Sequence, residues 1–237
     1  MKAIRHGSWF TCSKLKLGEI SMLTMQIILG SVTSEIGQTY HFSSAALADG
    51  CQFINELILD YIENNSEKIG STGRIVEVDK SKFRKRKYHR GQPVEGQRVF
   101  GGMERGSGKV ILVAVHDRSR ETLVSTIQEW IEPGTTIYSD CWKAFESLGQ
   151  EGYNHLTVNH NLHFVDPVIN CHTNSTGGTW RNVKTTLPHY NRQADFQFYL
   201  ALYLFRKSCD SKGVDHFNQF QEIIRDIDWE KKKPTQK

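Results

Sequence analysis

The chain has 237 residues, which is long enough to bury a sizeable core and to form one large domain or a medium domain with a smaller one. Its formal net charge of +4 is modest, so the composition permits a polyanionic partner without requiring one. The five cysteines are scattered without a CxxC pair, and no apolar run approaches the roughly 20 residues that a membrane-spanning helix needs, so we expect an intracellular protein without disulfides or a membrane span.

Residues 1–65 are predicted to form a small helical region. Apolar residues recur there at spacings of three to four, as in Phe53 and Leu57, and Ser43 or Ser44 suits the N-cap of the later helix. Two helices joined by a short turn are what a helix-turn-helix DNA reader needs, but any small helical bundle produces the same pattern. The region is therefore either a degenerate helix-turn-helix or a plain helical bundle.

After a polar, glycine-punctuated linker over residues 64–73, the pattern changes to strands with interleaved helices. Runs of β-branched and apolar residues predict strands over residues 75–83, 98–104, 110–115, 135–139 and 155–159. Apolar residues at helical spacing predict helices over residues 122–131, 142–148, 180–187 and 195–209, with a tail over 210–237. The first three strands form an antiparallel meander, and the mixture as a whole is typical of an α/β domain.

Asp79 lies at the end of the first predicted strand and is followed at once by a basic cluster. The cluster comprises Lys80, Lys82, Arg84, Lys85, Arg86, Lys87 and Arg90. A carboxylate that holds divalent cations, beside side chains that hold phosphates, suits a metal-assisted reaction on a polyanion. On these residues alone, a solvated hairpin with an ordinary strand-end aspartate is the simpler interpretation.

A second carboxylate, Asp140, follows the fourth predicted strand. If that strand lies beside the first one in the sheet, Asp79 and Asp140 emerge at the same edge, within reach of a shared metal ion. Nucleases and polymerases use two ions about 3.5 to 4 Å apart, one to activate the attacking oxygen and one to stabilise the leaving oxygen. Such a site usually needs a third ligand.

Six motifs follow one another between residues 61 and 209: VEVDKSKF, KRKYHRG, VFGGMERGSGK, SDCWKAF, LTVNH and HTNSTGGTWRNVK. Together they resemble the catalytic domain of Merlin-type DDE transposases and the related bacterial insertion-sequence transposases. The resemblance implies a ribonuclease-H-like α/β fold over residues 74–209, with a mixed sheet and flanking helices, and cut-and-paste transposition. It also implies that Asp79 and Asp140 are the first two metal-binding carboxylates, that Mg²⁺ or Mn²⁺ is the cofactor, and that Lys184 contacts DNA phosphate.

The partners implied by the resemblance are DNA, in the form of transposon ends, and further copies of the chain in a homo-oligomer, in the nucleus if the cell is eukaryotic. The expected DNA-binding residues are the basic side chains after the first carboxylate and the lysine of the last motif: Lys82, Arg84, Lys85, Arg86, Lys87, Arg90 and Lys184. The helices before residue 65 would correspond to the family's helix-turn-helix region, which they match only loosely.

Two departures from the family pattern weaken the predicted metal site. The last motif of the family has an acid seven residues before the lysine, and here Gly177 occupies that position without a ligand atom. Lys80 stands where relatives tend to carry an acid, and it adds positive charge beside Asp79. Asn174 or Glu104 could supply a substitute ligand, since amide and carboxylate oxygens both bind magnesium.

Three functions fit these observations. The first is a transposase-derived DNA-binding protein, decayed or domesticated, that has lost or severely reduced its cleavage chemistry. The second is a working magnesium-dependent transposase with a substitute third ligand, and the third is a folded relic or interaction module without affinity for DNA. The residue at position 177 is the feature that distinguishes the first function from the second. A salt-dependent DNA titration distinguishes the third function from the first.

Overall fold

The computed structural model describes residues 14–83, 97–117, 119–140, 145, 147–158, 174–186 and 196–227, apart from the side chains of residues 174–177 and 186. The chain divides into two compact units, one made of residues 65–204 and the other of residues 1–64 together with 205–237. Among the helices that are described, none is long and apolar enough to cross a membrane.

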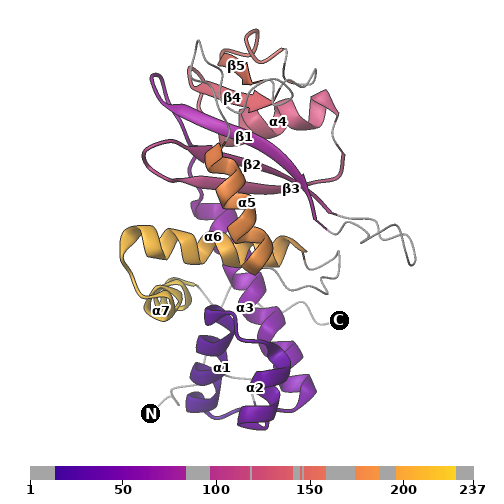
Figure 1. Cartoon of the computed structure of the whole chain (residues 1–237). Coiled ribbons are helices and arrows are strands. Elements are labelled where there is room, and N and C mark those ends of the chain that lie inside the picture. The colour runs from indigo at the N-terminus through magenta and orange to yellow at the C-terminus, as the bar shows by residue number, and fades with distance from the viewer. Residues whose placement is uncertain are drawn as a thin grey trace, which may run out of the picture. The chain divides into compact units, whose positions relative to one another are not determined.

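The predicted N-terminal helical region consists of three helices, which Figure 1 labels α1 (Leu17–Leu29), α2 (Thr33–Tyr40) and α3 (Ser44–Asn65). Helix α1 ends at Gly30, which adopts the left-handed conformation with φ 86° that glycine tolerates best. Of the two N-cap candidates for α3, Ser43 takes the role, because its hydroxyl oxygen accepts a hydrogen bond from the backbone N–H of Ala46 at 3.2 Å.

The same unit contains helix α7 (His216–Asp226), where the sequence analysis expected a tail from residue 210. That expectation is wrong in the region of α7, whose residues Phe220, Ile223 and Ile224 recur at helical spacing and are buried. Asp215 caps the helix by accepting a hydrogen bond from the backbone N–H of Asn218 at 2.9 Å. The unit formed by residues 1–64 and 205–237 therefore contains a helix after residue 210 that the sequence pattern did not predict.

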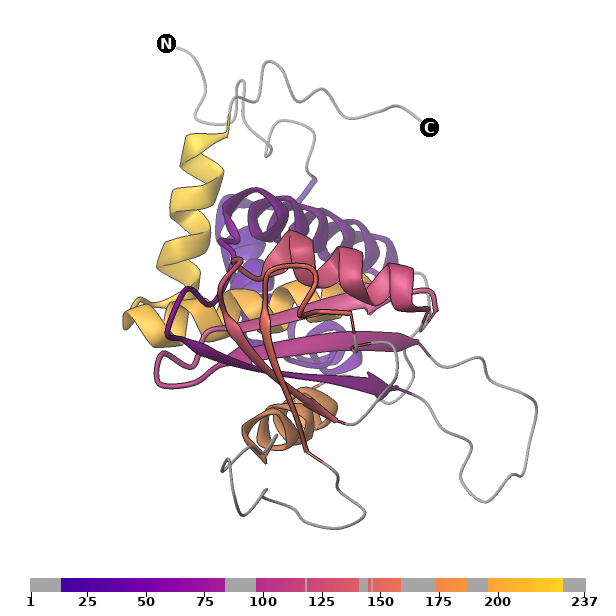
Figure 2. The ribbon, with the colours of Figure 1, turned by 90° about the horizontal axis from the view of Figure 1, so that it is seen from above.

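The larger unit is built on a five-stranded sheet, visible in Figures 1 and 2. Its strands are β1 (Ile75–Lys82), β2 (Arg98–Glu104), β3 (Val110–Val115), β4 (Thr136–Asp140) and β5 (Asn154–Val158), in the spatial order β3-β2-β1-β4-β5. The first three strands pair antiparallel, as predicted, whereas β4 pairs parallel to β1 and β5 parallel to β4. This mixed sheet with flanking helices confirms the predicted ribonuclease-H-like fold class.

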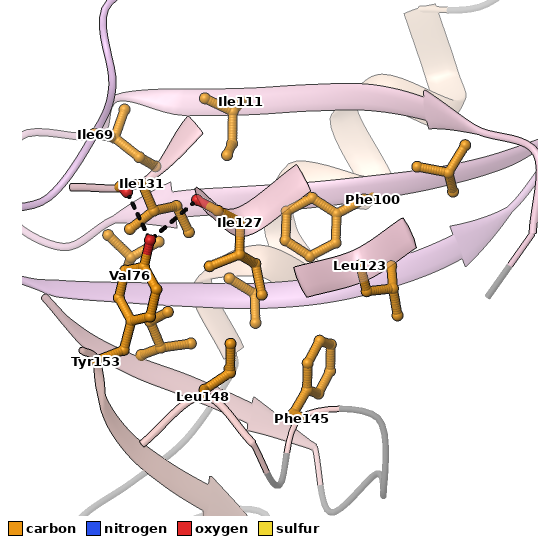
Figure 3. Close-up of a cluster of buried hydrophobic side chains, with 13 residues drawn as sticks. Ile69, Val76, Phe100, Ile111, Leu123, Ile127, Ile131, Phe145, Leu148 and Tyr153 are labelled. Carbon is orange, nitrogen blue, oxygen red and sulfur yellow. Dashed lines mark hydrogen bonds between the residues drawn. The ribbon is translucent and has the colours of Figure 1, made fainter. Parts of the chain in front are cut away.

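Helices cover both faces of this sheet, and Figure 2 shows α4 (Arg120–Trp130) and α5 (Asn174–Thr186) on opposite sides. On the α4 side, Val76, Phe100 and Ile137 from the strands pack with Leu123 and Ile127 of the helix, as Figure 3 shows in part. The alternate residues of the strands face α5 and the start of α6 (Phe196–Lys212), in a cluster formed by Phe83, Val99, Leu112, Trp180, Val183, Phe196 and Leu200. Because side chains alternate along a strand, the register of β1 decides which of its acids face α5.

Two further details differ from the sequence-based expectations. The stretch 64–73 is not only a linker, since Ile69 is buried and forms a parallel β-bridge with Ile131. In the part of 142–148 that is described, Phe145 and Leu148 belong to a tight turn in which the backbone N–H of Leu148 donates to the carbonyl of Phe145 at 3.1 Å. Ile69, Phe145 and Leu148 all belong to the buried cluster on the α4 side of the sheet.

Candidate active site

Asp79 and Asp140 occupy equivalent positions on two neighbouring parallel strands. The pairing of β1 with β4 sets Glu77 opposite Tyr138, and the two aspartates each lie two residues further along their strands. A step of two residues returns a side chain to the same face of a strand, so both carboxylates face the α5 side. They lie where β1 and β4 approach their C-terminal ends, and we call this part of the sheet the carboxylate edge. Burial raises the pKa of Asp79, and the negative charge of Asp140 raises it further, so the two carboxylates repel each other.

The carboxylate of Asp79 is held by two hydrogen bonds. One oxygen accepts from the backbone N–H of Lys80 at 2.6 Å, and the other accepts from the indole Nε1–H of Trp180 at 2.9 Å. Trp180 is buried on α5 and meets Phe83 edge to face, with 5.8 Å between the ring centroids. The first strand and α5 are thereby joined directly at the carboxylate.

Gly101 makes the approach of this indole possible. It is the residue on β2 that pairs with Asp79, and a Cβ atom at this position would lie 2.6 Å from Cζ2 of Trp180. Real Cβ contacts are essentially never so short, so any larger residue would push the ring away from the sheet. A glycine inside a strand often marks such a close approach.

Asp140 is paired with a cation from the same chain. The ammonium Nζ of Lys80 lies 3.2 Å from Oδ1 of Asp140 and also stands 5.0 Å from the centroid of the Phe145 ring. The Lys80 side chain is only 13% exposed, whereas that of Asp140 is 37% exposed. A sheltered ammonium group is therefore in place beside the second carboxylate.

Helix α5 carries the two remaining positions that the family resemblance singles out, Gly177 and Lys184. Gly177 lies near the start of the helix, three residues before Trp180, so residue 177 is on nearly the same helical face as the indole that reaches Asp79. Lys184 is exposed in the last turn, with its Nζ 5.7 Å from the centroid of the Phe83 ring. The exposed Arg181 adds a second cation on this helix, which the sequence analysis did not single out.

Glu104 does not replace the missing third acid. It pairs with Val76, three residues before Asp79, so it lies roughly 10 Å back along the sheet on the opposite face, the α4 side. Its carboxylate accepts a hydrogen bond from the backbone N–H of Gly70 at 2.8 Å and is nearly buried. Of the two proposed substitutes, this leaves Asn174, which begins α5 and whose side chain lies outside the described part of the chain.

The basic cluster is described only where it begins. Lys82 is half-buried at the end of β1, and the other expected DNA-binding residues of the cluster fall outside the described residues, namely Arg84, Lys85, Arg86, Lys87 and Arg90. The cations described on β1 and α5 near this end are thus Lys80, Lys82, Arg181 and Lys184, and Arg98 of β2 pairs with Lys82.

The donor set does not fit a two-ion centre. Within the described residues no group of three or more His, Cys, Asp or Glu side chains could hold a metal ion. The two carboxylates that share the edge already have partners, Trp180 and the backbone N–H of Lys80 for Asp79, and the Lys80 ammonium for Asp140. Two divalent ions would need more negative charge than this arrangement offers.

Sequence reasoning missed the two contacts that define the site, the Trp180 indole on Asp79 and the Lys80 ammonium on Asp140. Trp180 packs in the aromatic cluster on the α5 side and also donates the hydrogen bond to Asp79. The available signal was the glycine pair at residues 101 and 102 inside a predicted strand, since interior glycines mark close approaches.

The mixed five-stranded sheet with flanking helices defines a domain of ribonuclease-H-like fold. The family model described as the ISXO2-like transposase domain matches residues 70–207, which is more than half of the chain. The chain therefore belongs to the ISXO2-like transposase domain family.

Among known proteins, a transposase-like protein of Haemophilus influenzae is 28% identical over 94 residues, which cover 39% of this chain and 75% of that protein. The solved structures that are similar include the integrase catalytic core of HTLV-2 in complex with magnesium, at 15% identity and a TM-score of 0.33, covering 65% of this chain and 83% of that one. The catalytic core of BIV integrase has 14% identity and a TM-score of 0.40, covering 62% of this chain and 93% of that one.

Proposed function

We propose that this chain is a Merlin-type, transposase-derived DNA-binding protein in which cleavage of phosphodiester bonds is lost or severely reduced. The observation that carries the proposal is the state of the carboxylate edge, where Asp140 is paired with Lys80 and glycine stands at position 177. Family membership supports a DNA-related role, and the two acids without a third support the loss of chemistry. Such a protein is a decayed element or a domesticated copy, intracellular, and nuclear if the cell is eukaryotic.

DNA binding is expected to rest on the basic residues near the site. Lys82 lies at the end of β1, Arg181 and Lys184 are exposed on α5, and the remainder of the basic cluster follows β1 in the sequence. Because each neutralised phosphate releases counterions, affinity for duplex DNA should fall steeply with salt, with a log-log slope near −0.9 per phosphate contact. The partners proposed are transposon-end DNA and further copies of this chain.

The binding test uses charge reversal. Replacing Arg84, Lys85 and Arg86 by glutamate should flatten the salt slope, measured by fluorescence anisotropy, by about 1 for each residue that contacts a phosphate. A matched control reverses three exposed cations near the opposite edge of the sheet, Lys68, Arg74 and Lys109. An equal change of the salt slope in both triple variants would show that the DNA-binding face lies elsewhere. If the unmodified protein has no affinity for DNA, an interaction module is favoured instead.

The cleavage test uses a labelled DNA end with Mg²⁺ or Mn²⁺, the ions that the family resemblance implies. We expect no strand cleavage above background by the unmodified protein. Cleavage that is abolished by Asp79→Ala but kept in the exposed control Glu121→Ala would establish the alternative, an active transposase whose third ligand comes from a residue such as Asn174.

A further inference from the structure

The Lys80–Asp140 pair supports the proposed loss of cleavage, but that loss does not by itself require a cation beside Asp140. Loss of an acid at position 177 alone would leave two neighbouring carboxylates, at equivalent positions on β1 and β4, that repel each other. In relatives with metal ions, the cations offset this repulsion. Here an ammonium group from the chain itself lies 3.2 Å from Asp140.

The surroundings of Lys80 suit a built-in cation. Its side chain is 13% exposed and its Nζ stands 5.0 Å from the Phe145 ring centroid, in a position that suits a cation–π contact. Its charge reaches both acids, since burial and Asp140 raise the pKa of Asp79 whereas the Lys80 charge lowers it. The backbone N–H of the same residue also donates to Asp79 at 2.6 Å.

We infer that the Lys80 side chain takes the place of a divalent ion at this edge, so that its charge offsets part of the repulsion between Asp79 and Asp140 and the domain folds without metal. The inference rests on the proposed loss of cleavage chemistry, but it makes a separate claim about ion binding. A protein with this device keeps the transposase fold and its DNA-facing surface intact in the absence of Mg²⁺. Asp79 and Asp140 then have a structural role in place of metal binding.

The test measures binding of Mn²⁺ alone to the full chain, by electron paramagnetic resonance, and the melting temperature with EDTA or with Mn²⁺. Lys80→Gln should bind Mn²⁺ at least about 10-fold more tightly than the unmodified protein, the scale by which changes around a metal site alter affinity. It should also melt lower in EDTA and recover with Mn²⁺, whereas the melting temperature of the unmodified protein should not respond to the ion.

Two controls separate the site from a general charge effect. Arg98→Gln removes the same charge near the end of β1, where Arg98 pairs with Lys82 in the strand register, and it should leave Mn²⁺ affinity unchanged. Adding Asp140→Asn to Lys80→Gln should abolish the gain, because it removes one of the two ligands. An equal gain in Arg98→Gln, or none in Lys80→Gln, would overturn the inference.

A measurement on the unmodified protein covers the case in which Lys80→Gln does not fold. Paramagnetic Mn²⁺ should leave the amide NMR signals of Asp79 and Asp140 as sharp as those of Ile223 in the helical unit. Selective broadening of the two aspartate signals would show that an ion enters despite Lys80 and would overturn the inference. Cleavage is not measured in any of these experiments, so a failure of this inference is distinguishable from a failure of the proposed function.

Discussion

The indole of Trp180 and the carboxylate of Asp79 lie 101 positions apart in the sequence and meet through one hydrogen bond of 2.9 Å. The bond joins α5 to the carboxyl end of β1, at the residue that the family resemblance assigns as the first catalytic acid. The orientation of that carboxylate therefore depends on the seating of a helix on the sheet.

Replacing Trp180 by phenylalanine keeps an aromatic ring but removes the donor to Asp79. We expect the free energy of unfolding to fall by about 1 kcal/mol more than packing alone would explain, the net value of a typical hydrogen bond. The pKa of Asp79 should rise further, since the indole N–H is one of the contacts that lower it. Urea denaturation and a carboxyl NMR titration measure the two effects.

Trp130 provides the matched control for this variant. Its indole Nε1 is buried and has no hydrogen-bond partner among the residues that the structure describes, so Trp130→Phe changes packing without removing a hydrogen bond to any of them. If Trp180→Phe and Trp130→Phe cost the same stability, or if the pKa of Asp79 responds to both, the bond to Asp79 contributes nothing specific.

The glycine beneath the indole gives an independent test of the same contact. Gly101→Ala places a Cβ atom where Cζ2 of Trp180 would be 2.6 Å away, so the ring must move and the hydrogen bond to Asp79 must lengthen or break. Overpacking of this kind typically costs about 1–3 kcal/mol. Gly178→Ala is the control, because a Cβ atom there meets nothing within 4 Å, and alanine in a helix should stabilise by up to about 1 kcal/mol. A stabilised Gly101→Ala variant would contradict the packing described.

Much of the sheet could be predicted because its strands contain runs of β-branched and apolar residues, unbroken in Val110–Val115 and concentrated at Ile75, Val76 and Val78 in β1. The residues Asp79 and Asp140 could be picked out because each ends such a run. The contacts of Lys80 with Asp140 and of Trp180 with Asp79 could not, since they span 60 and 101 positions and depend on strand order and helix seating. Ile69 was assigned to a linker because its polar neighbours hide a single buried residue.

Asp117 gives the pH dependence that can be checked most directly. Its pKa is lowered to about 2, chiefly by the hydrogen bond from the backbone N–H of Ser119, with further bonds from the hydroxyls of Thr122 and Ser119 at the start of α4. Because the folded-state pKa lies below the unfolded value of 3.8, the stabilisation is present above pH 3.8 and is lost as the pH falls through about 2. Asp117→Asn should therefore lower the melting temperature near neutral pH. The melting temperature of this variant should also decrease less than that of the unmodified protein as the pH is lowered to 2.

The exposed Asp226, at the end of α7, serves as the comparison for that experiment. Asp226→Asn should leave the acid limb of the melting curve as it is in the unmodified protein. A melting temperature for Asp117→Asn that runs parallel to the unmodified protein from pH 5 to pH 2 would show that Ser119 does not hold this carboxylate in its charged form.

Gly177 is the position where sequence, structure and chemistry can be tested together. A glutamate introduced there would lie on nearly the same face of α5 as Trp180, whose indole reaches Asp79, and near the helix N-terminus, where a negative charge is favoured by about 0.3–1 kcal/mol. It would also replace a helical glycine, which costs about 1 kcal/mol relative to alanine. The substitution should therefore raise stability as well as supply a third acid.

We expect Gly177→Glu to tighten Mn²⁺ binding by at least about 10-fold when combined with Lys80→Gln, and by less on its own, because the Lys80 ammonium continues to occupy Asp140. Nicking of a labelled DNA end should appear first in the double variant. Gly178→Glu is the control, since it adds the same charge one residue on, at an exposed position about 100° further round the helix. If Gly178→Glu tightens Mn²⁺ binding equally, the effect is general electrostatics, and position 177 does not face the carboxylate edge.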